Sequence, residues 1–259
     1  MVIRPILQAG VALTLLATAP AAWAQRPAPP GCGAPEPQDR QQWMRRYDAS
    51  RTARTVAAPK IILLGDSITE RLETVFPQVW DRHFAPQQAL NLGFGRDTTA
   101  NLLWRLRNGQ VDGLKPDAVV IMIGTNNARC RESAEATAAS IGEVVAEARK
   151  RLPSARIVLL GLLPRRARDI SGPVNALLAE RYRAVPEVRF VDLSEPFAKD
   201  ANLYSDAVHP NAAGSELLAK KIIEQVQAAG RPAGAAQRGG NMLERAFAWL
   251  CTNLETLFA

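Results

Sequence analysis

The sequence is poor in the side chains that build metal and redox sites. Its 259 residues include two histidines, three cysteines and no Cys-x-x-Cys pair. No cysteine lies beside a histidine, which disfavours a zinc site and a cysteine nucleophile, and nothing points to another cofactor. In an oxidising compartment, Cys32, Cys130 and Cys251 allow one disulfide and leave one odd thiol. All three pairings stay open.

Several glycine-rich signatures are also missing. The sequence has no GxGxxG and no GxxxxGK[ST], which disfavours a dinucleotide-binding fold and a phosphate-binding loop. It lacks GxSxG, the nucleophile turn of α/β-hydrolases. Lysine and arginine outnumber aspartate and glutamate by 32 to 25, a net charge of +7 that favours anionic partners. Because no basic stripe is interleaved with aromatic residues, we expect no nucleic-acid partner.

Residues 1–24 have the features of a secretory signal peptide. Arg4 gives a short positive region, and residues 9–19 form an apolar core too short to span a bilayer comfortably. Ala22 to Ala24 forms a small-x-small cleavage site. We therefore expect an exported protein, periplasmic or extracellular, whose mature chain begins at Gln25. The alternative is an uncleaved anchor.

The rest of the chain divides into four expected parts. An N-terminal linker and strap (25–58), with a short helix near 39–53, precedes the main domain (59–230). A linker (231–240) and an amphipathic helix (241–259) follow the domain. The apolar stripe of this last helix predicts docking onto the domain or onto a second copy in a homodimer. Contact with a membrane surface is the alternative.

The main domain alternates between short apolar runs and helical segments. The expected strands are Lys60–Leu64, Ala89–Leu92, Asp117–Ile123, Arg156–Gly161 and Val188–Val191. The expected helices are Thr69–Phe84 with a break near Pro77, a helix capped by Asp97 or Thr98 that ends near Arg107, Ser133–Arg151, Val174–Ala184 and Asn211–Ala228. An irregular stretch is expected before His209. Long connections between strands indicate parallel pairing with right-handed crossovers. The expected fold is α/β: a three-layer α/β/α sandwich around a flavodoxin-like, doubly wound parallel sheet of about five strands.

The first strand leads directly into a candidate nucleophile. The apolar run 61–64 suits a strand buried on both faces, and Gly65, Asp66 and Ser67 follow it. A serine at this point lies at the carboxyl edge of the sheet, where open α/β folds bind ligands. The start of the next helix also supplies free N–H groups for an oxyanion. The simpler interpretation is that Ser67 only caps the helix.

The scarcity of histidine leaves two candidates for a general base. His83 lies inside a helical segment and is expected to be a packing or surface residue. His209 lies in a loop three residues after Asp206. A carboxylate at this spacing can orient the imidazole, whose other nitrogen can take a proton from a serine hydroxyl.

Three loops after the first three strands could supply donors for a developing oxyanion. The first loop provides the N–H of Ser67, the second the backbone of Gly95 and Arg96, and the third the side-chain amide of Asn126. Because parallel strands end at one edge of the sheet, these donors are expected to meet there.

These residues resemble the four motif blocks of the GDSL/SGNH hydrolases. The blocks are Gly65-Asp66-Ser67, the Asn91–Arg96 turn, Gly124-Thr125-Asn126 and Asp206-x-x-His209. Within the family, residues 89–99, 103–106, 119–127 and 161–165 are similar to the catalytic subunits of intracellular platelet-activating-factor acetylhydrolase. The resemblance covers about residues 60–227, so 59–230 is identified as an SGNH hydrolase domain.

The resemblance implies a role for each residue of the site. Ser67 would be the nucleophile, His209 the general base and then acid, and Asp206 its orienting group. The three loop donors would form the oxyanion hole, with no metal. One departure is Arg96, which stands where the family usually has glycine; its side chain could narrow the pocket or bind an anionic substrate.

The expected function is an exported serine esterase that hydrolyses short-chain esters, most of all acetyl esters, of a lipid or an acetylated carbohydrate. The basic loop containing Arg165, Arg166 and Arg168 follows the fourth strand, so it could rim the site and favour an anionic substrate. The alternative is a non-catalytic SGNH-fold module that binds envelope polysaccharide or a protein partner.

Overall fold

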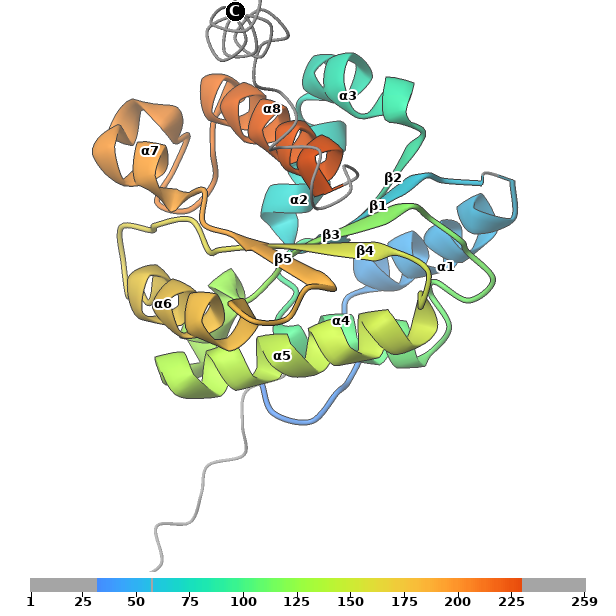
Figure 1. Cartoon of the computed structure of the whole chain (residues 1–259), viewed down its shortest axis with the longest axis horizontal. Helices are drawn as coiled ribbons and strands as arrows, with labels where there is room; N and C mark the ends of the chain where they lie inside the picture. Colours follow the sequence, from blue (N-terminus) through green and yellow to red (C-terminus); the bar gives the residue numbers. More distant parts are fainter. Residues whose placement is uncertain (1–31, 57, 230–259) are drawn as a thin grey trace, which may run out of the picture.

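A parallel five-stranded sheet forms the centre of the molecule, in the order β2-β1-β3-β4-β5 (Figure 1). The computed structural model describes residues 32–56 and 58–229. The strands are β1 (Ile61–Gly65), β2 (Ala89–Gly93), β3 (Ala118–Met122), β4 (Arg156–Leu160) and β5 (Val188–Val191). All four pairings are parallel, which confirms the expected doubly wound sheet.

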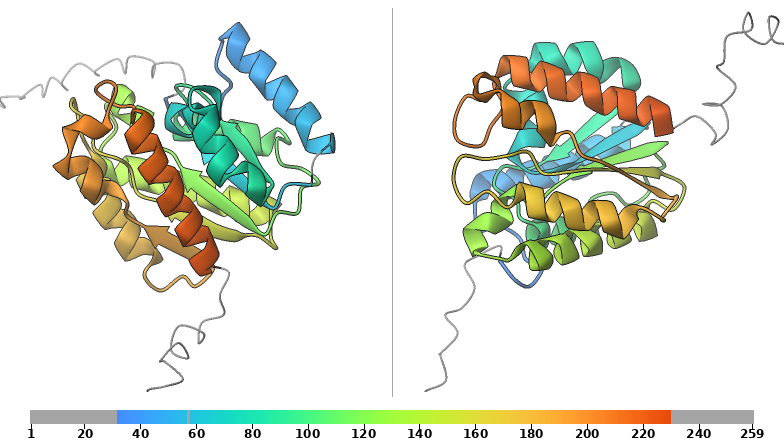
Figure 2. Two further views of the ribbon diagram at one scale, coloured as in Figure 1. Left: turned by 90° about the horizontal axis from the view of Figure 1, so that it is seen from above. Right: turned by 60° about the vertical axis from the view of Figure 1, so that its left-hand side comes forward.

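Helices cover both faces of the sheet, so the three-layer α/β/α prediction is also confirmed (Figures 1 and 2). One face carries α4 (Thr99–Arg107), α5 (Ala134–Arg151) and α6 (Ser171–Tyr182). The other face carries α2 (Ser67–Thr74), α3 (Pro77–His83), α7 (Ser194–Lys199) and α8 (Ala212–Ala229). Short 3-10 helices are η1 (Ala85–Gln87), η2 (Thr125–Cys130) and η3 (Ala201–Leu203).

The alternation of side chains along the strands builds two separate cores. Ile62 and Leu64 of β1 pack toward α4 and α5, whereas Ile61 and Leu63 pack toward α2, α3 and α8. The central strands are therefore buried on both faces, as their unbroken apolar sequences predict. In the sheet register, Gly65 at the end of β1 lies beside Gly93 of β2 and Met122 of β3. The three loops that follow consequently start at one edge.

The strap, residues 32–56, contains α1 (Gln41–Val56) and packs beside β2 (Figure 2, left). Trp43 and Tyr47 of α1 form an aromatic cluster with Phe94 and Trp104. Cys32 at its start is joined to Cys130 by a disulfide with Cα atoms 5.5 Å apart. One of the three possible pairings is thus observed, and Cys251 lies outside the described residues.

Two sequence expectations were wrong in detail. The stretch before His209 is not irregular throughout, because it contains α7 and η3. The helix expected from Val174 begins at Ser171, since Pro173 falls in its first turn, where proline is tolerated. The expected signal peptide, the 231–240 linker and the 241–259 helix lie outside the described residues. Within the described ranges, no helix is both long enough and apolar enough to cross a membrane.

Candidate active site

Ser67, His209 and Asp206 form a hydrogen-bonded chain at the carboxyl edge of the sheet. Ser67 Oγ lies 2.9 Å from His209 Nε2. The other ring nitrogen, Nδ1, lies 2.8 Å from Asp206 Oδ2. Ser67 is the first residue of α2, and His209 lies in the loop before α8. The structure therefore brings together two residues 142 positions apart in the sequence, in the arrangement that activates a hydroxyl.

Backbone contacts hold the histidine loop in place. Asp206 Oδ1 accepts from the amides of Val208 and His209, both at 2.8 Å. Partial burial acts to raise the Asp206 pKa, but these hydrogen bonds and the imidazole contact outweigh it and lower the pKa to about 2. Tyr204 OH donates to the Pro164 carbonyl at 2.6 Å, which ties this loop to the one after β4. Asp206 is therefore an anion over the whole physiological pH range.

The turn into α2 explains why glycine and aspartate precede Ser67. A Cβ atom on Gly65 would lie 2.1 Å from Thr69 Oγ1 and 2.7 Å from the Met122 carbonyl, so only glycine fits. Asp66 caps α2 by accepting from the Ile68 amide at 3.0 Å. Its carboxyl is buried, and burial, together with the charges of Asp97 and Glu70, raises its pKa to about 7. The cap at this position is thus Asp66 and not Ser67.

The loop after β2 places Gly95 and Arg96 beside this turn. Phe94 N donates to the Gly65 carbonyl at 3.0 Å, which joins the second loop to the end of β1. Arg96 has φ +67°, in the left-handed region that glycine adopts at no steric cost. The glycine-like geometry is therefore present, although the residue is an arginine. No acceptor for the amides of Ser67, Gly95 or Arg96 is found among the described residues.

Asn126 completes the set of sequence-predicted residues. It lies in η2, and its Nδ2 donates to the Asp97 carbonyl at 2.9 Å. Because an amide nitrogen carries two hydrogens, one N–H can still serve a ligand. The neighbouring Asn127 is buried and has a structural role, since it bonds the amide and hydroxyl of Thr99 at 3.1 and 2.7 Å.

The sequence interpretation missed a buried ion pair beneath the second loop. Asp97 Oδ2 lies 2.7 Å from Arg105 Nη2, and both side chains are fully buried. Asp97 Oδ1 accepts from Trp43 Nε1 at 2.6 Å and from Gln38 Nε2 at 2.8 Å. Gln38 and Trp43 belong to the strap, so a segment remote in sequence holds the loop that carries Arg96. No local pattern marks Asp97, which the sequence suggested only as a possible cap; Thr98 is the residue that caps α4.

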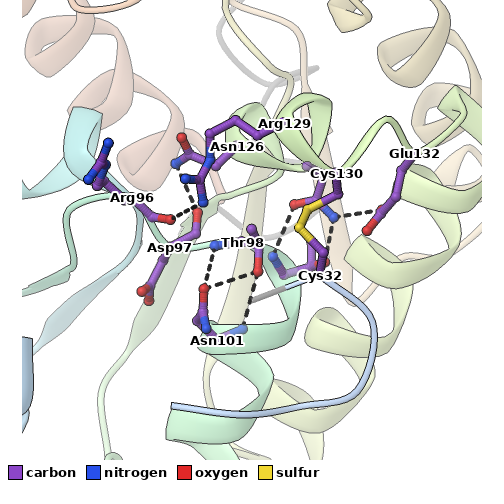
Figure 3. The surroundings of a disulfide bond; sticks show 11 residues. Cys32, Arg96, Asp97, Thr98, Asn101, Asn126, Arg129, Cys130 and Glu132 are labelled. Carbon is purple, nitrogen blue, oxygen red and sulfur yellow. Dashed lines mark hydrogen bonds between the residues drawn. A yellow bond between two sulfur atoms is a disulfide. The ribbon is translucent and has the colours of Figure 1, made fainter. Parts of the chain in front are cut away.

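The strap is attached to the site at two further places. Arg46 Nε donates to the Gly93 carbonyl at 2.8 Å and pairs with Glu70 of α2 at 3.3 Å. The Cys32–Cys130 disulfide fastens the strap to the end of η2, the element that carries Asn126 (Figure 3). The strap therefore fixes both the loop after β2 and the loop after β3 from outside the sheet. No group of three or more His, Cys, Asp or Glu side chains in the described ranges is placed to hold a metal ion.

Comparison with known proteins agrees with this geometry. The GDSL-like Lipase/Acylhydrolase family matches residues 63–217, which include Ser67, Asn126, Asp206 and His209. The chain belongs to this family. The acylhydrolase is 30% identical over 199 residues to platelet-activating factor acetylhydrolase IB subunit alpha2 of Rattus norvegicus, covering 73% of this chain and 85% of the rat protein. It is accordingly an ester hydrolase of the SGNH/GDSL type.

Solved structures share the fold of this acylhydrolase. A GDSL-like lipase from Bacteroides thetaiotaomicron VPI-5482 superposes with a TM-score of 0.57 at 21% identity, over 71% of this chain and 97% of that chain. A carbohydrate esterase family 3 structure from Talaromyces cellulolyticus gives 0.52 at 22% identity, over 66% and 99%. These likenesses confirm the SGNH fold.

Proposed function

We propose that the protein is an exported serine esterase that hydrolyses short-chain, chiefly acetyl, esters through an acyl-enzyme. The observation that carries the proposal is the chain Ser67 Oγ, His209 Nε2, His209 Nδ1 and Asp206 Oδ2, with contacts of 2.9 and 2.8 Å. These are distances at which a proton can pass from hydroxyl to imidazole.

In this mechanism, Ser67 Oγ attacks the ester carbonyl while His209 Nε2 takes the hydroxyl proton. The anionic Asp206 holds the Nδ1–H form of the ring and stabilises the imidazolium that forms. Collapse of the tetrahedral intermediate breaks the ester bond, and the alcohol leaves with the proton from His209. Water then attacks the acyl-enzyme with His209 as base, which releases the carboxylic acid and restores Ser67.

The oxyanion hole is assigned to three donors. They are the N–H of Ser67, the N–H of Gly95 or Arg96, and the Asn126 amide. Backbone donors of this kind depend on loop position and not on side-chain identity, so an arginine at position 96 leaves the hole intact. The strap contacts to Asp97 and Gly93 support this assignment, because a rigid loop keeps its donors aimed without reorganisation.

Two observations support export. Residues 1–24 have the charge, apolar core and cleavage site of a secretory signal. The Cys32–Cys130 pairing is a second support, since disulfides persist in oxidising compartments such as the periplasm and the extracellular space.

The proposed preference for acetyl esters is based on the activities that the names of similar proteins give. The rat relative is a platelet-activating factor acetylhydrolase, and the fungal fold relative is a carbohydrate esterase. The natural ester is accordingly proposed to be an acetylated carbohydrate or a lipid ester.

The test compares 4-nitrophenyl acetate with its longer-chain homologues, using the wild type and Ser67→Ala. The wild type is expected to prefer acetate, and loss of the nucleophile should reduce turnover by about four or more orders of magnitude. Labelling of the wild type, but not of Ser67→Ala, by a fluorophosphonate probe provides an independent readout. A wild type that is inactive on every chain length and unlabelled would instead favour the non-catalytic binding module.

A further inference from the structure

Three arginines lie on or beside the loops that carry the assigned oxyanion donors. We call Arg96, Arg129 and Arg165 the arginine cluster. Arg129 Nη2 donates to the Arg96 carbonyl at 3.4 Å, and Arg165 Nη1 donates to the Thr125 carbonyl at 3.0 Å. Figure 3 shows Arg96 and Arg129 next to Asn126. The second, third and fourth strand-end loops each contribute one guanidinium.

The arginine cluster places three positive charges on the loops at one edge of the sheet. Within the described residues, no ion pair includes any of the three arginines. Partial desolvation, together with the charges of Arg96 and Arg165, lowers the pKa of Arg129. Such mutual repulsion raises the free energy of the empty site, and an anion bound between the guanidinium groups would relieve it.

Arg165 provides a second, independent observation. Its Nε is buried and has no hydrogen-bond partner among the described residues. Buried N–H donors are nearly always satisfied, so the protein leaves part of the hydrogen-bonding capacity of this guanidinium unused. Of the basic residues in the loop after β4, Arg165 is the one whose side chain contacts the Asn126 loop; Arg166 contacts the histidine loop through its backbone amide, which bonds the Ala207 carbonyl at 3.0 Å.

The surroundings of Arg165 also fit an organic acid better than a bare ion. Arg165 lines a hollow of about 180 Å³ between the loop after β4, α7, η3 and Ala207 of the histidine loop. Phe197 and Tyr204 contribute its aromatic wall, and Arg166 lies at the same hollow. A substrate with an apolar portion and an acidic group can contact both kinds of surface.

We propose that the arginine cluster binds a carboxylate or phosphate group of the ester substrate and so selects anionic esters. Guanidinium groups match the planar or tetrahedral arrangement of these oxygens and bind them through charge-assisted hydrogen bonds. This proposal rests on the proposed esterase function and names the class of its substrate.

The experiment uses esters that differ in charge but share a leaving group of similar shape. These are 4-acetoxybenzoate, its neutral methyl ester, and 4-acetoxyphenyl phosphate. The measured quantity is the ratio of kcat/KM for each anionic ester to that for the neutral one. The variants are Arg129→Gln and Arg165→Gln. The matched control is Arg183→Gln. Arg183 is exposed, pairs with Glu180 and directly follows α6, at the opposite end of the strands from the arginine cluster.

The wild type should prefer at least one anionic ester, mostly through a lower KM. Each cluster substitution should reduce the preference about tenfold, which corresponds to one partly exposed charge-assisted hydrogen bond. The control should keep the wild-type ratio, and added salt should weaken the preference in the wild type more than in the cluster variants. A larger effect on the phosphate or on the carboxylate would identify which acid the cluster binds.

Failure of this inference is distinct from failure of the esterase proposal. If the wild type hydrolyses none of the three esters, the esterase mechanism itself is refuted. If the neutral ester is hydrolysed but the two cluster variants keep the wild-type ratio for both anionic esters, the arginine cluster is not an anion subsite.

Discussion

Replacing Asp66 by asparagine should stabilise the folded protein at pH 8 and have a progressively smaller effect as the pH falls. The Asp66 side chain is only 1% exposed, and burial raises its pKa to about 7. Asparagine retains the oxygen that accepts from the Ile68 amide at 3.0 Å and removes the charge. The substitution therefore isolates the cost of holding a buried carboxylate in its ionised form.

The magnitude follows from the difference between the folded pKa of about 7 and the ordinary value of 3.8. Because the folded state binds the proton more tightly, this group contributes its stability below pH 3.8 and loses it as the pH rises through 7. Each pKa unit corresponds to about 1.4 kcal/mol, so the loss reaches at most about 4 kcal/mol above pH 7. The Asp66→Asn protein lacks this loss.

The assay is urea unfolding followed by tryptophan fluorescence at several pH values between 5 and 8. The difference in unfolding free energy between Asp66→Asn and wild type should grow up to pH 7 and then level off. Asp81→Asn, which removes an exposed charge from α3, is the matched control and should show no such trend. A difference for Asp66→Asn that stays constant across this range would refute the desolvation argument.

Three further predictions concern the second loop and the strap. In urea unfolding, Arg96→Ala should be less stable than Arg96→Gly by about 1 kcal/mol, because residue 96 has φ +67° and only glycine adopts that angle without strain. The opposite order of stability would contradict a left-handed conformation at this residue. Trp43→Phe removes the 2.6 Å hydrogen bond to buried Asp97. This change should lower the free energy of unfolding by about 2 kcal/mol and lower kcat on 4-nitrophenyl acetate. An unchanged free energy of unfolding would show that the hydrogen bond contributes nothing to stability. Cys32→Ser should lower the free energy of unfolding by about 2–4 kcal/mol, because the disulfide to Cys130 closes a span of 98 residues. Dithiothreitol should lower the Tm of the wild type but not of this variant.

The sheet was predictable because its strands are buried on both faces. An unbroken apolar run such as Ile61–Leu64 has few alternatives when glycine follows it and a helical segment comes next. Helix α7 was missed for the opposite reason. It has six residues, includes Pro196 and buries only Phe197, so it has no periodicity to detect.

Ser67 and Asp206 each lie within hydrogen-bonding distance of His209, as predicted. The sequence offered few alternatives to this triad. With two histidines in the chain, only His209 could lie at the same sheet edge as Ser67. The strand-end positions of Arg96 and Asn126 followed from the expected topology. Their catalytic roles stay predictions until the kinetic tests are made.

The support behind the site was not predictable. The bond from Trp43 to Asp97 joins residues 54 positions apart, and that from Gln38 joins residues 59 apart. Such pairs have no spacing rule, because they depend on how an independent helix packs against the finished domain. A buried carboxylate bonded by an arginine, a tryptophan and a glutamine is visible only in three dimensions.

The disulfide also has a consequence for the order of events during biosynthesis. Cys32 is synthesised 98 residues before Cys130, and β1, β2 and β3 all lie between them. The loops that receive Gln38, Trp43 and Arg46 are likewise made after the strap. The strap is thus the first part of the described chain to be translated and among the last to be bonded to the rest of the fold. An oxidoreductase that forms this bond must act on a chain whose first three strands have already been made, and until then Cys32 is a free thiol exposed to wrong partners.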